Sequence, residues 1–280
     1  MIKGYLKRIL NLITRPEMKI LPGQLAYFII LSMFPLLTLF GYIGSKTLFF
    51  LEPLINILGR ILPSNVMQII LPFIEKSHIT GNVAFFMIIG FILVSNGTYS
   101  IIITANELYG IHNSDYIKDR IKAFFMIILL MILFTFAFVV LAYGNIIVKG
   151  ILDLKLFSTV SKNMYALFVL FKWPVAFIFV FWLFNFLYTI APDERIPSRL
   201  MNKGSLFTTI GFVLFTFIYS FYVSHLANYS LFYGSISGII VMMIWVYMLS
   251  YIFVMGIAIN VDEYNIFKKE NKNLKKDNNK

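Results

Sequence analysis

Six uncharged stretches of the chain are each long enough to cross a lipid bilayer. A hydrocarbon core about 30 Å thick is spanned by a helix of about 20 apolar residues, each of which adds about 1.5 Å. The six stretches are Gln24–Ser45, Val83–Ala105, Ala123–Val148, Trp173–Ile190, Ser205–Ser224 and Ser235–Asn260. A soluble core could not enclose so many wholly apolar helices in a chain of this size. We therefore predict an all-α integral membrane protein with six transmembrane helices.

The composition narrows the chemistry available to the chain. Hydrophobic residues make up 59% of it and charged residues 13%, whereas a soluble domain is about a quarter charged. Cysteine is absent, which excludes disulfides, thiolate metal sites and cysteine nucleophiles. The net charge of +11 lies in loops and tails, where it sets membrane topology. We expect membrane lipids as partners and no nucleic acid.

The distribution of positive charge predicts the orientation. Six spans place both termini on one side of the membrane. That side carries more than twice as many lysines and arginines as the other. Because cytoplasmic loops are enriched in these residues, we predict a multi-pass plasma (inner) membrane protein with both termini in the cytoplasm.

Four regions are predicted along the chain. Residues 1–22 form a cytoplasmic interfacial helix, which is either a simple anchor or a lipid sensor. Residues 23–265 form the membrane domain. Within it, residues 47–80 form two short extracytoplasmic helices, which either pack over the bundle or act as a lid over a cavity. Residues 266–280 form a basic cytoplasmic tail, rich in Lys and Asn and expected to be disordered.

Polar side chains recur at helical spacing on three of the predicted spans. Polar groups in hydrocarbon need a partner or a hydrated cavity. They can also simply bond to neighbouring helices or to their own backbone, so both interpretations stay open. The candidates for lining a substrate cavity are Asn96, Ser100 and Thr104 on the second span, Asn185 and Thr189 on the fourth, and Thr216 and Ser220 on the fifth.

The groups that catalysis requires are missing from the sequence pattern. The three histidines, His78, His112 and His225, are scattered. No metal-site spacing, glycine-rich phosphate loop or serine nucleophile elbow is present. We therefore predict no catalytic residues, no metal and no cofactor. Pro35 lies in the middle of the first span and is expected to kink it.

Several short motifs together resemble the YihY/BrkB family of membrane proteins. The resemblance covers about residues 20–265. The segments that carry it are LAYFIILSMFPLL from Leu25 to Leu37, NELY from Asn106, YTIAP from Tyr188 to Pro192, Gly204, Tyr219, YGS from Tyr233, IWVY around Trp245, and GIAIN from Gly256 to Asn260. We expect the family-motif residues Pro35, Asn106, Tyr188, Pro192, Tyr219, Tyr233, Gly234, Trp245, Gly256 and Asn260 to serve helix ends and packing.

The resemblance implies a plasma-membrane protein of the cell envelope. Members of the family are linked to envelope integrity, serum resistance or lipid-precursor export. An older ribonuclease label for the family finds no nuclease site in this sequence. The family's last helix usually closes on Gly-Ala-Glu-x-Asn, but here Ala258 takes the place of the glutamate. A mechanism that depends on that carboxylate does not apply to this chain.

Three functions follow from these observations. The leading prediction is passive or ion-coupled movement of a lipid-like or small amphiphilic envelope substrate. The alternative is an envelope-integrity or assembly scaffold that transports nothing. The third is an enzyme of the ribonuclease type, which the missing catalytic groups disfavour.

Overall fold

The computed structural model describes residues 14, 16–46, 52, 55, 56, 58, 59, 64–75, 83–112, 115–131, 161–225, 229 and 233–277. The described residues form helices and connecting turns, and none of them is in a strand. The elements are α2 (Glu17–Lys46), α4 (Ser64–Glu75), α5 (Val83–Tyr109), α7 (Ser161–Ile190), η1 (Ser198–Met201), α8 (Asn202–His225), η2 (Gly234–Ile236) and α10 (Ser237–Asp277). A further helical segment covers residues 116–131. The predicted all-α class is confirmed.

The predicted apolar stretches correspond to helices. Five of them lie in α2, α5, α7, α8 and η2–α10, and the third begins within the helical segment 116–131 and continues outside the described residues. Two helices in the described part, Ser198–His225 and Ser237–Asn271, are long and apolar enough to cross a membrane. The number of six spans remains a prediction.

Two helix boundaries differ from those predicted. α7 begins at Ser161 rather than near Trp173, because Lys172 bounds the uncharged stretch but does not stop a helix. α10 continues to Asp277, so the tail predicted to be disordered is helical up to that residue. No proline or glycine follows Gly256, and lysine and glutamate are good helix formers. Of the predicted interfacial helix at residues 1–22, residues 1–13 lie outside the described residues, and residues 17–22 are the beginning of α2.

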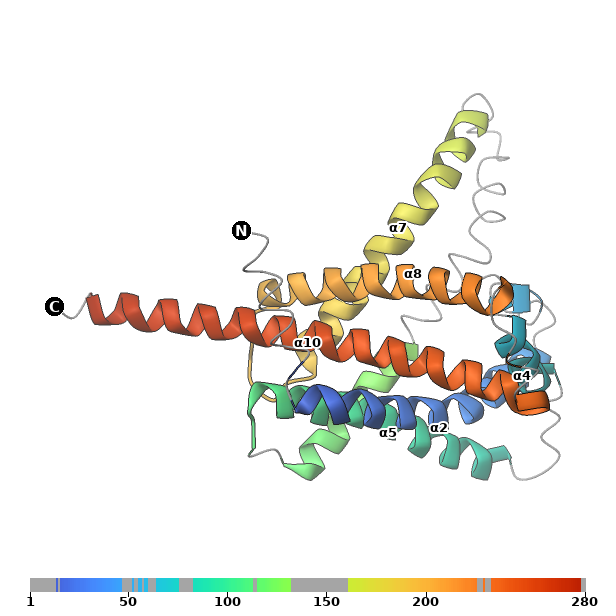
Figure 1. Ribbon diagram of the computed structural model, residues 1–280, viewed down its shortest axis with the longest axis horizontal. Helices are drawn as coiled ribbons and strands as arrows, with labels where there is room; N and C mark the ends of the chain where they lie inside the picture. Colours follow the sequence, from blue (N-terminus) through green and yellow to red (C-terminus); the bar gives the residue numbers. More distant parts are fainter. Residues whose placement is uncertain are drawn as a thin grey trace.

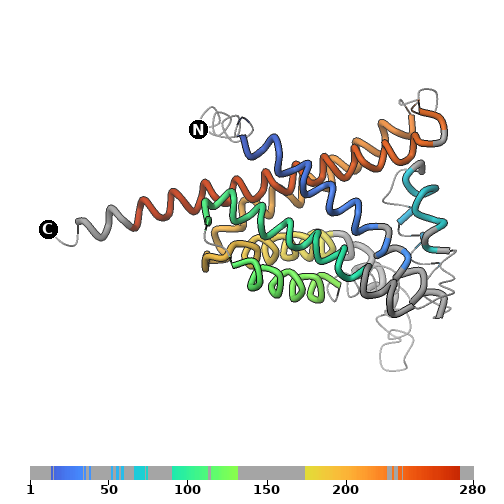
Figure 2. The backbone as a smooth tube through the Cα atoms, turned by 90° about the horizontal axis from the view of Figure 1, so that it is seen from below, coloured from blue at the N-terminus to red at the C-terminus, as the bar shows by residue number. Residues whose placement is uncertain are grey.

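The helices pack in a consecutive order. α5 lies against α2, α2 against α10, α10 against α8, and α8 against α7. Figure 1 shows α10 running through the middle, with α8 on one side and α2 and α5 on the other, while α7 leaves the bundle at a steep angle. In both views the end of α10 projects beyond the other helices (Figures 1 and 2). α10 therefore lies between α2 and α8 and packs against both.

Two buried clusters hold the helices together. The larger joins the start of α2, the ends of α5 and α7, and the later part of α10. The smaller includes Val66, Ile70 and Ile74 of α4, which follow i, i+4, i+8 spacing and pack toward α2, α8 and α10. α4 is thus the second of the two predicted short helices. The first, around residues 48–61, lies mostly outside the described residues.

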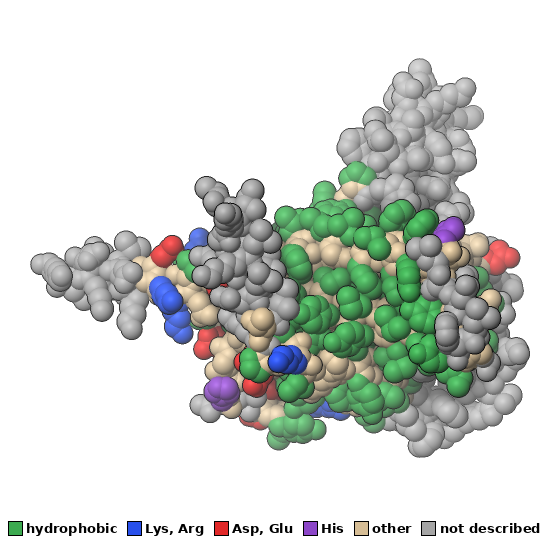
Figure 3. Space-filling view, viewed as in Figure 1, with side chains coloured by type: hydrophobic (Ala, Val, Ile, Leu, Met, Phe, Trp, Pro, Cys, Tyr) green, Lys and Arg blue, Asp and Glu red, His purple; other side chains and the backbone are tan. Residues whose placement is uncertain are grey.

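The surface of α8 is unusually apolar. Val213, Phe217 and Ile218 are each more than half exposed, and hydrophobic side chains cover much of the face in Figure 3. In that view the charged side chains of the described residues gather mainly toward the end of the molecule where α10 projects. An apolar face of this extent is typical of contact with lipid or with another protein.

Candidate functional site

A cluster of polar residues joins three helix ends; it consists of Asn106, Asp119, Lys122 and Asp193 and is called the helix-end cluster below. The ammonium of Lys122 donates to the backbone oxygens of Ala191 and Pro192 at 2.7 and 2.9 Å. It also donates to Asp193 Oδ1 at 2.7 Å. A lysine is favoured here, because the last carbonyls of α7 have no partner within the helix and carry partial negative charge. These three bonds use all three ammonium protons.

Asn106 holds the same aspartate from the other side. Its Nδ2 donates to Asp193 Oδ2 at 2.5 Å, and its Oδ1 accepts from the backbone N–H of Asp193 at 3.0 Å. The end of α5 positions this amide: the backbone N–H of Ile111 donates to the Asn106 carbonyl at 2.8 Å. Gly110 makes that turn possible, since its φ of 70° is readily adopted by glycine.

The carboxyl of Asp193 is held ionised. Partial burial alone would raise its pKa, but the hydrogen bond and charge of Lys122, with hydrogen bonds involving Asp119 and Asn106, lower the pKa below its ordinary 3.8. Both carboxylate oxygens already accept hydrogen bonds. A carboxylate so fully engaged is unsuited to act as a general base, so the cluster is a clamp between α5, the segment 116–131 and α7.

A second group of family-motif residues lies where α7, α8 and α10 meet; Tyr188, Gly204, Thr208, Gly256 and Asn260 are called the junction below. A Cβ on Gly204 would collide with the Gly256 carbonyl oxygen and with Asn260 Oδ1. The two helix backbones therefore touch, as small residues allow in membrane helix pairs. Asn260 Oδ1 accepts from the backbone N–H of Gly204 at 2.8 Å.

The phenol of Tyr188 completes the junction. Its single proton goes to the carbonyl oxygen of Phe253 at 2.9 Å. The Thr208 hydroxyl, 2.6 Å away, must then donate to the Tyr188 oxygen. A Cβ on Gly256 would collide with both hydroxyls. These contacts pack the three helices closely together; that the family-motif residues serve helix ends and packing stays a prediction.

The remaining family-motif residues lie apart from the junction. A Cβ on Gly90 would lie 3.2 Å from Pro35 Cβ, so Pro35 packs where α2 and α5 meet, and α2 runs through it as one helix. Tyr219 donates to the Val241 carbonyl at 2.8 Å. Gly234, at a φ of 52°, opens η2 directly after Tyr233. These last two residues lie at the opposite end of α8 from Pro192.

The predicted cavity residues are not gathered around one space. Asn185 Nδ2 donates to Ser198 O at 3.3 Å and to Asn202 Oδ1 at 2.8 Å, and Thr189 donates to the Asn185 carbonyl. Thr216 accepts from Trp245 Nε1 at 3.4 Å, and Ser220 is half-buried. The stripe on α5 lies in the layer beyond α10. A cavity lined jointly by the second, fourth and fifth spans is therefore not formed by the described residues.

Some buried polar side-chain atoms on α2, α5 and α10 have no hydrogen-bond partner among the described residues. Ser100 and Thr104 are buried, while Asn96 is half-buried. Among the described residues, the side-chain oxygens of Ser100, Thr104 and Ser250 have no hydrogen-bond partner, nor does Glu17 Oε2. The same holds for Ser95 Oγ on α5 and for Asn260 Nδ2 at the junction. Glu17, Ser100, Thr104 and Ser250 belong to α2, α5 and α10, which pack against one another; this interface is called the seam below.

Sequence reasoning missed the charged members of the helix-end cluster. Lys122 is the last charged residue before an apolar stretch, and Asp193 directly follows Pro192 of a family motif. These two positions are the features of the sequence from which the cluster could have been predicted. Ala258, where the family has glutamate, is fully buried. Within the described residues, no three histidines, aspartates or glutamates are grouped to hold a metal; that the chain is not an enzyme stays a prediction.

An all-helical bundle with an exposed apolar surface and polar clusters at its helix ends is typical of a membrane protein. The sequence profile of the family described as "Virulence factor BrkB" matches residues 13–280, and the chain belongs to this family of membrane proteins.

Relatives of similar length support the assignment. The chain is 29% identical over 265 residues to "Putative ribonuclease-like protein YfkH" of Bacillus subtilis, covering 92% of this chain and 94% of that one. It is 23% identical over 261 residues to a "UPF0761 membrane protein" of Vibrio campbellii (90% and 80% covered) and 24% over 271 residues to one of Psychromonas ingrahamii (92% and 86%). No solved structure matches with statistical significance.

Proposed function

We propose that the chain crosses the plasma membrane six times, with both termini in the cytoplasm. Helices at five of the apolar stretches, the helical start of the third, and the lysine and arginine bias of the loops support this arrangement. Because the chain contains no cysteine, single cysteines can report it directly. Cysteines at Ser158 and Asn228 should react with an impermeant reagent in intact cells, and one at Asn273 should not. Labelling at position 273 from outside would overturn the topology.

Within this arrangement, the protein moves a lipid-like or small amphiphilic envelope substrate. The observation that carries this proposal is the set of buried hydroxyls on Ser100, Thr104 and Ser250 without partners. A polar group in hydrocarbon is costly to leave unpaired. A polar headgroup moving along the seam would supply the missing partners, and the seam would lower the cost of desolvating that headgroup. The seam thus replaces the cavity expected between the second, fourth and fifth spans.

Headgroup translocation in reconstituted vesicles tests this role. The double variant Ser100→Ala/Thr104→Val removes two hydroxyls of the seam. α8 supplies a matched control, because Ser205 and Thr209 have the same spacing and are equally buried, but donate to backbone carbonyls four residues earlier at 2.7 and 2.8 Å. We expect the α5 variant to slow translocation at least tenfold and Ser205→Ala/Thr209→Val to leave it within twofold.

The alternative is a scaffold for envelope assembly, favoured by the apolar face of α8, which could bind a partner. A scaffold needs no polar route through the membrane. Translocation by the native protein no faster than in empty vesicles would support this alternative, as would equal rates for the two double variants and the native protein.

A further inference from the structure

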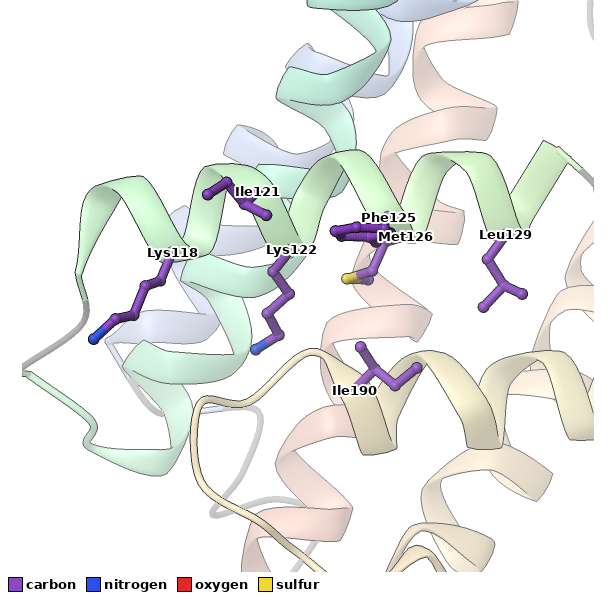
Figure 4. Close-up of a pocket in the computed structure, with 7 residues that line it drawn as sticks. All are labelled: Lys118, Ile121, Lys122, Phe125, Met126, Leu129 and Ile190. Atoms are coloured by element: carbon purple, nitrogen blue, oxygen red, sulfur yellow. The ribbon is translucent and has the colours of Figure 1, made fainter.

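A groove lies between the helical segment 116–131 and the end of α7. Its volume is about 380 Å³, within the range of ligand pockets. Lys118, Lys122, Phe125 and Leu129 line it at i, i+4, i+7, i+11 spacing, so they share one helix face. Ile190 of α7 lines the opposite wall (Figure 4). The two lysines are at one end, and apolar side chains continue from them along the helix.

The wall of the groove is therefore almost wholly apolar, and the two lysines mark one end of it. The third apolar stretch begins at Ala123. The lysine end of the groove therefore lies just before the predicted third span, at the expected edge of the hydrocarbon core. Phe125 is 67% exposed although it lies within the apolar stretch. An exposed aromatic next to lysines is unfavourable in water but suits the boundary between lipid headgroups and acyl chains.

The two lysines are not equivalent toward an anion. Lys122 already donates to Ala191, Pro192 and Asp193, so its charge is compensated. Lys118 is 82% exposed, and it forms an ion pair with Asp115, at 3.5 Å with a half-exposed carboxylate. Such a surface pair contributes little, so Lys118 can turn to a phosphate at the end of the groove.

We propose that this groove binds a phospholipid of the inner leaflet with a net negative headgroup, with its phosphate at Lys118 and an acyl chain along Phe125, Leu129 and Ile190. Charge complementarity at Lys118 and the continuous apolar wall support this occupant. The inference rests on the membrane placement proposed above. It does not require transport, because a scaffold would hold the same lipid.

Native mass spectrometry of the full chain, purified from mixed phosphatidylglycerol and phosphatidylcholine, tests this site. We expect the native protein to retain phosphatidylglycerol preferentially. Lys118→Gln should reduce that retention about fivefold, the factor expected for one lysine near anionic lipid. Lys268→Gln, which removes an equal charge from the exposed part of α10, should leave it unchanged.

The apolar wall is tested separately. Ile190→Trp fills the groove and should reduce phosphatidylglycerol retention, whereas Ile210→Trp adds the same bulk to the exposed surface of α8 and should not. Equal retention of the two lipids by the native protein would overturn the proposal. So would equal losses for Lys118→Gln and Lys268→Gln, which would indicate attraction to the net charge alone. Binding is measured without translocation, so a failure here is distinct from a failure of the transport proposal.

Discussion

The junction and the seam both bury polar groups among apolar helices, but only the junction gives nearly all of them partners. At the junction, Gly204 and Gly256 let two backbones touch, and Tyr188 and Thr208 bond within the contact. At the seam, the hydroxyls of Ser100 and Thr104 are equally buried and have no partner among the described residues. Most buried polar groups in proteins are paired. The contrast therefore indicates that the polar groups of the junction serve packing, whereas those of the seam are available to hydrogen-bond a polar ligand.

The largest effect is expected at the junction from Gly204→Ala. The added Cβ meets the backbone of Gly256 and the side chain of Asn260, so α8 and α10 must separate. We expect a loss of about 3 kcal/mol in the free energy of unfolding, measured by denaturant titration in detergent micelles. Gly23→Ala in α2 is the control, since its Cβ would make only an ordinary contact with Tyr247. A Gly204→Ala protein as stable as the control would mean that the backbones do not touch.

The helix-end cluster is a third polar site, in which the charges of Lys122 and Asp193 form an ion pair. Lys122→Met leaves the Ala191 and Pro192 carbonyls and the Asp193 carboxylate without their cation, which should cost about 2 kcal/mol. Lys118→Met, on the same helix but 82% exposed, should change stability by less than about 0.5 kcal/mol. Equal effects of the two substitutions would contradict the assignment of Lys122 as a clamp.

The same cluster makes a prediction about pH. The folded-state pKa of Asp193 lies below its unfolded value of about 3.8. Its ionised form therefore stabilises the protein above pH 3.8, and this contribution is lost as the pH falls through the lower folded-state pKa. The stability difference between the native protein and Lys122→Met should accordingly shrink below about pH 3.8, in the same denaturant titrations. A difference that stays constant to pH 2 would contradict the ion pair.

A smaller effect is expected from Tyr188→Phe. This substitution removes only the phenol oxygen, and with it the bonds to Phe253 and Thr208. A buried hydrogen bond between membrane helices contributes about 0.6 kcal/mol on average, so the two together should contribute about 1 kcal/mol. Tyr27→Phe, on an exposed side chain of α2, should be neutral. A neutral Tyr188→Phe would show that the glycine contacts alone hold the junction.

The sequence predicted the helices well because hydrocarbon-length apolar runs leave the backbone few alternatives to helix. It predicted their ends less well. Lysines mark where a span leaves the membrane, but they also favour helix, so α7 starts earlier and α10 ends later than the charges indicated.

The site was less accessible to sequence reasoning than the fold. Helical spacing placed Ser100 and Thr104 on one face, and both are buried. Spacing within one helix carries no information on which helices are neighbours, so α10 was not expected between the stripes of α5 and α8. Lys122 and Asp193 meet across 71 residues of chain. Their pairing depends on how α7 packs, which no local pattern specifies.

The smallest effect compares the two hydroxyl pairs directly. Ser205→Ala/Thr209→Val on α8 removes two satisfied bonds to backbone carbonyls four residues earlier and should destabilise the protein by less than about 1 kcal/mol. Ser100→Ala/Thr104→Val on α5 removes oxygens that bond to nothing among the described residues. Since deleting an unpaired buried hydroxyl relieves a desolvation penalty, this variant has the smallest expected effect and should be as stable as the native protein or slightly more stable. Denaturant titration of both variants measures the difference. If the α5 pair instead proves as costly to remove as the α8 pair, its hydroxyls are bonded in the folded protein, and the seam has no unmet need for a polar ligand. If Ser100→Ala/Thr104→Val leaves stability unchanged but slows headgroup translocation, then the two hydroxyls contribute to function and not to the stability of the fold.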